Sequence, residues 1–180
     1  MARAPSLSPT DEPHARGWLP VAHGHAVYWE QFGNRAAPAL LWLHGGPGSG
    51  CSPRQRQQFD AARWHVTFVD QRGCGRSRAE DDLRANTTAH LIADLERLRR
   101  HLGLARWTVC GGSWGATLAL AYAAAHGPVV EALVLRSVFL AERAQVDALL
   151  QPPPPAAGAA AGLAWAGLLA ALGELSADPS

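Results

Sequence analysis

The sequence has no lysine, a single methionine and only three cysteines among its 180 residues. Its 16 basic residues, all of them arginine, nearly cancel 15 acidic ones, so no basic excess is available to hold a nucleic-acid backbone. The cysteines are odd in number and widely spaced, and they form neither a disulfide framework nor a CxxC zinc pattern. These scarcities argue against nucleic-acid binding and a structural zinc site, and they favour a reducing, cytoplasmic compartment.

Long apolar runs are also scarce. The first 17 residues contain prolines and both signs of charge but no apolar stretch, so they predict an irregular leader and not a secretory signal. Residues 156–173 contain only Ala, Gly, Leu and one Trp, which reaches the lower length limit of a membrane span. Alanine and glycine contribute little transfer energy, and four prolines precede the run, so a partly ordered helix or a frayed tail is favoured over a membrane span.

Hydrophobic residues nevertheless make up 48% of the chain, which is enough to bury a sizeable core. Short apolar runs bounded by turns are typical of strands in a sheet that is covered on both faces. Such runs occupy residues 18–22, 26–32, 39–43, 64–69, 107–110 and 130–135. Apolar residues three or four positions apart predict a helix that begins near Thr87 or Thr88 and stops at Gly103.

Residues 113–125, rich in alanine and leucine, predict a second helix, and residues 141–150 predict a third. Strands that alternate with helices predict an α/β fold with a mostly parallel sheet over residues 18–140. Residues 141–180 are expected to form the start of a further, cap-like region or a degenerate tail.

The clearest chemical motif is Gly-Gly-Ser-Trp-Gly at residues 111–115, a G-x-S-x-G sequence between an apolar strand and an apolar helix. Such a sharp turn exposes the serine hydroxyl, and glycines two residues before and after the serine leave room where a Cβ would clash. The start of the helix places backbone N–H groups beside a reacting carbonyl. The motif predicts Ser113 as a nucleophile, and a glycine-rich turn in which Ser113 merely caps the helix is the alternative.

A second motif, His-Gly-Gly-Pro-Gly at residues 44–48, also follows a predicted strand. Glycine allows the backbone to approach a substrate closely, so this loop is a candidate source of an oxyanion-stabilising N–H group, the other being that of Trp114. The donor in the loop is Gly45 or Gly46, because Pro47 has no N–H.

Residues 70–77, Asp-Gln-Arg-Gly-Cys-Gly-Arg-Ser, follow another strand and carry two glycines and two arginines. They match neither G-x-x-x-x-G-K-[ST] nor G-x-G-x-x-G, so nucleotide binding is rejected. The loop is expected to form a buried ion-pair and turn network below the site, with Asp70 and Arg72 as supporting residues. His44, at the end of its strand, is interpreted as a structural, hydrogen-bonded histidine and not as a base.

Together these motifs resemble the prolyl iminopeptidase (prolyl aminopeptidase) family of the α/β-hydrolase superfamily. The resemblance covers roughly residues 17–143 and rests on HGGPG (44–48), DQRGCGRS (70–77), NTT (86–88), GGSWGATLAL (111–120) and LVLRSVFL (133–140). Two positions depart from the family pattern. Gly127 lies between His126 and Pro128, where the family usually has His and Pro adjacent, and Ser137 stands where glycine is usual.

The resemblance implies an α/β-hydrolase fold and a serine hydrolase that releases N-terminal proline from small peptides without a metal or other cofactor. It implies that Ser113 is the nucleophile and that Gly46 and Trp114 are the oxyanion donors. The residues expected to support them from the surrounding loops are His44, Gly45, Gly48, Asp70 and Arg72.

The family uses a Ser-His-Asp triad, and in this fold the acid and then the histidine follow the serine along the chain. Here the only histidine after Ser113 is His126, 13 residues away and before every later acid. One helix of that length separates its ends by about 20 Å, whereas proton transfer needs a distance near 3 Å. We therefore expect that the acid and base are absent from this chain and that it is a C-terminally truncated member. An esterase of other specificity and a catalytically inactive truncated product are the alternatives, and the oligomeric state stays open.

Overall fold

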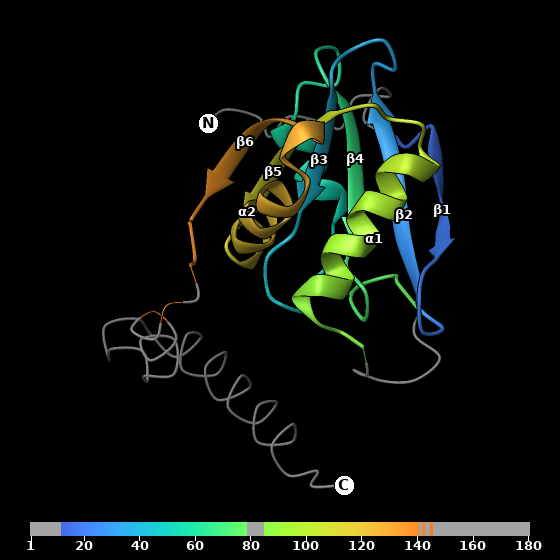
Figure 1. Ribbon diagram of the computed structural model, residues 1–180. Helices are drawn as coiled ribbons and strands as arrows, with labels where there is room; N and C mark the ends of the chain where they lie inside the picture. Colours follow the sequence, from blue (N-terminus) through green and yellow to red (C-terminus); the bar gives the residue numbers. More distant parts are fainter. Residues whose placement is uncertain (1–11, 79–84, 141, 143–144, 146–180) are drawn as a thin grey trace, which may run out of the picture. The chain divides into compact units, whose positions relative to one another are not determined.

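The computed structural model describes residues 12–78, 85–140, 142 and 145 (Figure 1). The chain divides into two compact units, Met1–Phe139 and Leu140–Ser180. In the second unit, the Leu140 N–H donates to the side chain of Gln145 (2.8 Å), and the Gln145 N–H donates to the Glu142 carbonyl (2.9 Å). The rest of the helix expected over residues 141–150, and all of residues 151–180, lie outside the described residues.

Six strands of the first unit form one sheet in the order β1-β2-β4-β3-β5-β6 (Figure 1). β2 pairs antiparallel with both β1 and β4, whereas β4, β3, β5 and β6 run parallel to one another. The strands are β1 (Ala15–Pro20), β2 (Ala26–Gly33), β3 (Ala39–Leu43), β4 (His65–Asp70), β5 (Trp107–Gly112) and β6 (Val130–Arg136). The mostly parallel sheet confirms the α/β architecture that the sequence predicts.

The first strand departs from expectation. β1 begins at Ala15, inside the segment expected to be an irregular leader, and it ends at Pro20 instead of residue 22. No apolar run marks its start, because β1 lies at the edge of the sheet and is held by pairing with β2, where Ala15 is opposite Gln31 and Gly17 is opposite Trp29. The other five strands start within one residue and end within two residues of the predicted positions.

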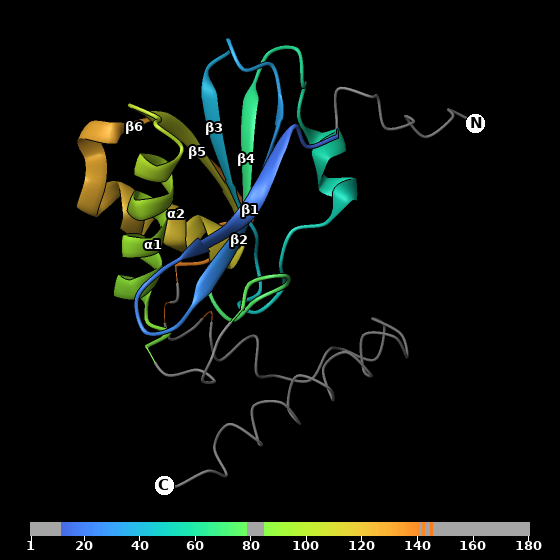
Figure 2. The same cartoon turned by 90° about the vertical axis from the view of Figure 1, so that its right-hand side faces the viewer.

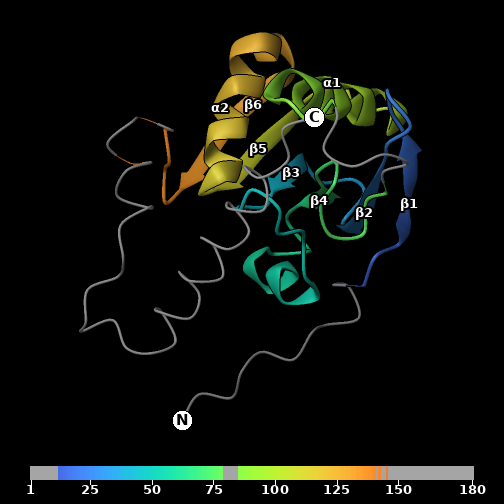
Figure 3. The ribbon, with the colours of Figure 1, turned by 90° about the horizontal axis from the view of Figure 1, so that it is seen from below.

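Two helices lie on one face of the sheet, and a short 3-10 helix lies on the other (Figures 2 and 3). Helix α1 (Thr88–His101) begins after Thr87, whose side chain caps it by accepting from the His90 N–H. Helix α2 (Trp114–His126) is apolar on most of its surface because it packs on both the sheet and α1. The opposite face carries η2 (Pro53–Gln58).

Apolar side chains fill both sides of the sheet. On the helical side, Leu95 and Leu98 of α1 and Leu118 of α2 are buried with residues of the central strands. On the η2 side, Phe32 and Phe68 meet edge to face, with ring centroids 5.1 Å apart. Since the central strands are covered on both faces, they appear in the sequence as unbroken apolar runs.

The parallel strands determine where the loops meet. β3, β4 and β5 point the same way, so the loops that follow their carboxyl ends lie at one edge of the sheet. Those loops begin at His44, Gln71 and Ser113, and each of the three motifs singled out in the sequence includes one of these positions. Among the described residues, no helix has both the length and the apolar character needed to cross a membrane.

Candidate active site

One residue, Ser113, forms the whole turn between β5 and α2. Its φ of 55° and ψ of −123° lie outside the regions that residues with a Cβ normally occupy, which costs about 1–3 kcal/mol. Its N–H donates to the Arg136 carbonyl (3.0 Å), and its carbonyl accepts from the Ala116 N–H (2.8 Å). Ser113 is exposed, so this strained turn presents its hydroxyl to solvent.

The glycines on either side of Ser113 are required by close packing and not by their φ angles. A Cβ on Gly111 would lie 2.2 Å from the carbonyl oxygen of Gly115. A Cβ on Gly115 would lie 2.2 Å from the carbonyl oxygen of Leu43, at the end of β3. In real proteins a Cβ essentially never lies closer than 3.0 Å to such a backbone atom. The glycine spacing therefore allows the turn to pack against itself and against β3.

The HGGPG loop lies directly beside Ser113. A Cβ on Gly45 would lie 3.2 Å from the Cβ of Ser113 and 3.8 Å from its Oγ. Gly46 and Gly48 have φ angles of 121° and 98°, and the peptide bond between Gly46 and Pro47 is cis. A Cβ on Gly46 would also lie 2.6 Å from the backbone nitrogen of Gly48. Glycine at these positions lets the loop fold tightly next to the hydroxyl.

Some backbone N–H groups in these turns donate to no backbone carbonyl. Within the part of the chain that the structure describes, they include the N–H groups of Gly45, Gly46 and Trp114. Trp114 is the first residue of α2, where an N–H has no acceptor within the helix. Free N–H groups at a helix start favour negative charge, so the Trp114 N–H, together with one from the HGGPG loop, is a candidate donor to a developing oxyanion.

His44 is fully buried and uses both ring nitrogens. Its Nε2 accepts from the Gln71 N–H (3.0 Å), so the neutral ring carries its proton on Nδ1, which donates to the Gly45 carbonyl (2.8 Å). The Gly50 N–H also lies 3.1 Å from Nδ1, but Nδ1 does not accept from it in this tautomer. Burial lowers the pKa of His44, against the opposing effects of the Gly45 carbonyl and Asp70. His44 is a neutral residue that shapes the loop.

Gln71 is the site residue that the sequence interpretation missed. Its side-chain Nε2 donates to the His44 carbonyl (2.9 Å), and its Oε1 accepts from the indole N–H of Trp114 (3.0 Å). It therefore joins the HGGPG loop to the first residue of α2. The only available signal was its position inside the 70–77 motif, between two residues that were selected.

Asp70 is buried and accepts hydrogen bonds from the loops on both sides of it. The Cys51 N–H donates to Oδ1 (2.7 Å), while the backbone N–H and Nε of Arg76 donate to Oδ2 (2.9 and 2.8 Å). Burial alone would raise the pKa of Asp70, but the hydrogen bonds from Arg76 and Cys51 outweigh it and lower that pKa. Arg76 also pairs with Glu30 (2.8 Å), which binds Arg56 on its other oxygen (2.9 Å). The loop thus forms the expected kind of ion-pair network, in which Asp70, Glu30 and Arg56 are buried and Arg76 is partly exposed.

Arg72 supports the same loop from the side of α1. Its guanidinium makes two hydrogen bonds to Asp94 (2.8 and 2.7 Å) and one to the Ala85 carbonyl (2.7 Å). Both partners of the ion pair are buried, so the pair holds residues 70–77 to the helix. The Arg72 guanidinium contacts Asp94 of α1 and Ala85 just before that helix, and it makes no hydrogen bond to Ser113. The sequence had no means of identifying Asp94 as its partner.

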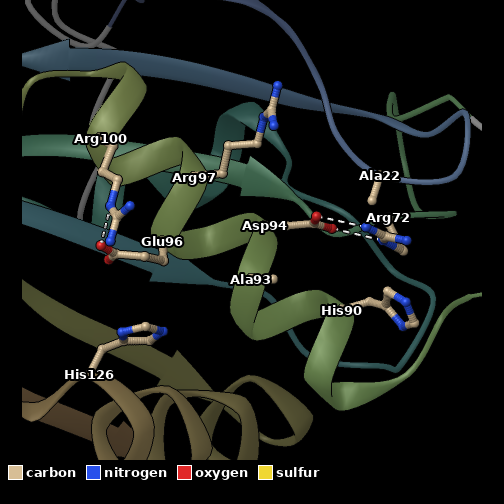
Figure 4. Close-up of a pocket in the computed structure, with 9 residues that line it drawn as sticks. All are labelled: Ala22, Arg72, His90, Ala93, Asp94, Glu96, Arg97, Arg100 and His126. Atoms are coloured by element: carbon tan, nitrogen blue, oxygen red, sulfur yellow. Dashed lines mark hydrogen bonds and ion pairs between the residues drawn. The ribbon is translucent and has the colours of Figure 1, made fainter.

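The Arg72–Asp94 pair lines a surface cavity of about 560 Å³ beside α1 (Figure 4). In Figure 4 the Arg97 side chain is directed away from His126. The lining side chains do not converge on one point, and Ser113 is not among them. This cavity is separate from the turn at Ser113.

No general base for Ser113 emerges from the described histidines. His126 ends α2, the 13-residue helix that starts directly after Ser113, and its ring packs on Tyr122 with centroids 5.1 Å apart. That helix places His126 about 20 Å from its start, beyond hydrogen-bond reach. Within the described ranges there is also no cluster of three His, Cys, Asp or Glu residues able to hold a metal ion.

The fold and these turns define a class of protein. The chain belongs to the α/β-hydrolase fold family, whose sequence profile matches residues 38–174. Its relatives are hydrolases. The chain is 46% identical over 140 residues to a probable proline iminopeptidase of Leptolyngbya boryana, covering 78% of this chain and 44% of the relative. It is 48% identical over 142 residues to the proline iminopeptidase of Xanthomonas citri, covering 79% and 45%.

A probable proline iminopeptidase of Streptomyces coelicolor is 50% identical over 149 residues, with coverages of 80% and 46%. Among solved structures, a proline iminopeptidase-related protein of Thermus thermophilus superposes with a TM-score of 0.60 at 32% identity, covering 67% of this chain and 43% of the other. VinJ superposes with a TM-score of 0.61 at 28% identity, covering 69% and 44%. The chain therefore spans a little under half the length of the curated relatives that it matches.

Proposed function

We propose that this chain provides the nucleophile and the oxyanion donors of a serine aminopeptidase that releases N-terminal proline from small peptides. The observation that carries the proposal is the exposed Ser113 hydroxyl, held on a strained turn beside the HGGPG loop. The similarity to proline iminopeptidases supports the choice of substrate.

In this reaction Ser113 Oγ bonds to the carbonyl carbon of the N-terminal proline and gives its proton to a base. The carbonyl oxygen becomes an oxyanion, which the N–H groups of Gly46 and Trp114 stabilise. The C–N bond then breaks, and the leaving amine takes up the proton. Water hydrolyses the resulting ester, which releases proline and restores the serine hydroxyl.

The base and the acid are not assigned to any described residue of this chain. His44 is buried and already uses both ring nitrogens, and His126 lies at the far end of α2. Removal of a triad member leaves only about 10³–10⁴-fold acceleration over water, supplied by the oxyanion donors and binding. We therefore expect slow turnover by the isolated chain, with imidazole in solution acting as a substitute base.

The test uses the 180-residue chain and its Ser113→Ala variant. With imidazole present, we expect a fluorophosphonate to label Ser113, as mapped by mass spectrometry of peptides. We also expect nitroaniline release from L-proline p-nitroanilide to rise with imidazole in the parent chain and not in the variant. No Ser113-dependent labelling at any imidazole concentration would overturn the proposal. Fast turnover without imidazole would show that a base is present in this chain.

Substrate class is tested separately, because a serine turn with two oxyanion donors can hydrolyse esters as well as amides. Short-chain p-nitrophenyl esters, L-alanine p-nitroanilide and L-proline p-nitroanilide are compared under the same conditions. Preference for proline over alanine among the anilides supports the aminopeptidase assignment. Ester hydrolysis with no preference between the anilides would instead favour an esterase of other specificity.

A further inference from the structure

Gln71 connects the two turns that carry the free N–H groups. It follows β4 directly, and only 4% of its surface is exposed. One end of its amide donates to the His44 carbonyl, and the other end accepts from the indole of Trp114. An indole N–H can only donate and a carbonyl can only accept, so the orientation of this amide is determined by its partners.

The backbone of Gln71 adds a third contact to the same loop. Its N–H donates to Nε2 of His44 (3.0 Å), which keeps the ring proton on Nδ1 and so maintains the hydrogen bond to the Gly45 carbonyl (2.8 Å). The two residues that precede Gly46 are therefore held at three polar atoms. All of these contacts are buried or partly buried, where loss of one partner leaves the other unsatisfied.

We propose that Gln71 is a positioning residue that holds the oxyanion donors of Gly46 and Trp114 at a fixed separation. The proposal rests on the function proposed above, because it requires an oxyanion to form at these two groups. Gln71 itself touches neither Ser113 nor the substrate in this scheme. It acts through the backbone that precedes Gly46 on one side and through the Trp114 side chain on the other.

The chemistry of the bridge explains why an amide is needed. A glutamate at position 71 would accept from the indole but could not donate to the His44 carbonyl, and two acceptors would face each other. A methionine of similar length would fill the space and make neither hydrogen bond. Loss of a whole oxyanion donor costs about 10²–10³-fold in rate, and misplacement by 1 Å costs about 10²-fold. Loosening the bridge should cost less, about tenfold.

The test measures Ser113 labelling by a fluorophosphonate in the presence of imidazole. Ser113 Oγ forms a bond to phosphorus as the P–F bond breaks, fluoride leaves and the hydroxyl proton passes to imidazole. The phosphoryl oxygen occupies the position of the oxyanion. The variants are Gln71→Met, Gln71→Glu, Trp114→Phe and the double variant Gln71→Met/Trp114→Phe, and Trp114→Phe keeps the backbone N–H while removing the indole donor.

We expect Gln71→Met and Gln71→Glu to lower the maximal labelling rate about tenfold with little change in the probe concentration that gives half that rate. Trp114→Phe should have part of this effect, and the double variant should be no slower than Gln71→Met, because both changes break the same bridge. Gln31→Met is the matched control, since Gln31 is another buried glutamine whose amide donates to a side chain (Thr67 Oγ1, 3.2 Å) away from the site. It should lower stability without slowing labelling.

The outcomes separate the two proposals. If the parent chain labels at Ser113 and both Gln71 variants label at the parent rate, the positioning role is wrong while the nucleophile stands. If Gln31→Met slows labelling as much as Gln71→Met, the effect is general destabilisation and the positioning role is again wrong. If the parent chain shows no Ser113-dependent labelling, both proposals fall. Should Gln71→Met not fold, Gln71→Glu and Trp114→Phe decide the matter by the same criteria.

Discussion

Replacement of Gly115 with alanine should destabilise the protein strongly, because the turn after Ser113 packs backbone to backbone on β3. The added Cβ would lie 2.2 Å from the Leu43 carbonyl oxygen and 2.8 Å from that of His44. One of the two backbones would have to move by about 0.8 Å to reach the 3.0 Å below which such contacts essentially never occur.

Neither backbone is free to move. Leu43 is fully buried and is paired on both sides, with Val69 of β4 and with Gly111 of β5. Gly115 lies in the first turn of α2, which packs on the same sheet. Overpacking a core usually costs about 1–3 kcal/mol, and we expect the upper end here because no flexible side chain can give way. For a chain of this size that corresponds to a fall of about 6–12 °C in melting temperature.

Circular dichroism during heating measures the effect, and Gly127→Ala is the matched control. Gly127 has φ −45° and ψ −43°, and nothing lies within 4 Å of its would-be Cβ, so alanine there should be neutral or stabilising by up to about 1 kcal/mol. A Gly115→Ala variant that melts within about 2 °C of the parent chain would refute the argument that steric contact with β3 imposes the glycine.

Two further predictions concern strain and pH. Ser113→Gly should be more stable than Ser113→Ala by about 1 kcal/mol in chemical denaturation, because glycine tolerates the φ of 55° at this turn; equal stabilities would show that the turn is not strained. The pKa values of His14 and His65 are lowered, first by burial and then by Arg35, so the unfolded chain binds protons more readily than the folded one as pH falls below about 6.5. The free energy of unfolding should therefore fall as the pH is lowered through about 6.5, the pKa of an unperturbed histidine. The variant His14→Gln/His65→Gln should lose part of this dependence, and an unchanged profile would contradict the assignment.

The central strands and the turn motifs were predictable because their signals are local. β3 was expected at residues 39–43 and is found there, since a strand covered on both faces is an unbroken apolar run in the sequence. The G-x-S-x-G motif already indicated that a Cβ would clash at Gly111 and at Gly115, and the structure shows close backbone contacts at both positions. The start of β1 at Ala15 was not predictable, because an edge strand is defined by pairing with its neighbour and not by its own pattern.

The contacts between loops could not be predicted, although the loops themselves could. Gln71 and Trp114 are 43 positions apart in the chain, and Arg72 and Asp94 are 22 apart. No sequence periodicity relates such positions. Gln71 and Trp114 meet because β4, β3 and β5 lie side by side, which brings their carboxyl-terminal turns to one edge of the sheet. Arg72 meets Asp94 because helix α1 lies beside the loop that follows β4.

The sequence by itself located the central strands, the two helices and the three glycine-containing turns, but not the start of the edge strand β1. Hydrophobic periodicity and the steric freedom of glycine act over a few residues, whereas an edge strand is defined by its pairing. Only the tertiary structure decided that Gln71 bridges two of those turns and that Arg72 forms an ion pair with Asp94 of α1 instead of contacting Ser113. A hydrogen bond or ion pair depends on the distance between side chains in space, and that distance is set by the order of strands in the sheet.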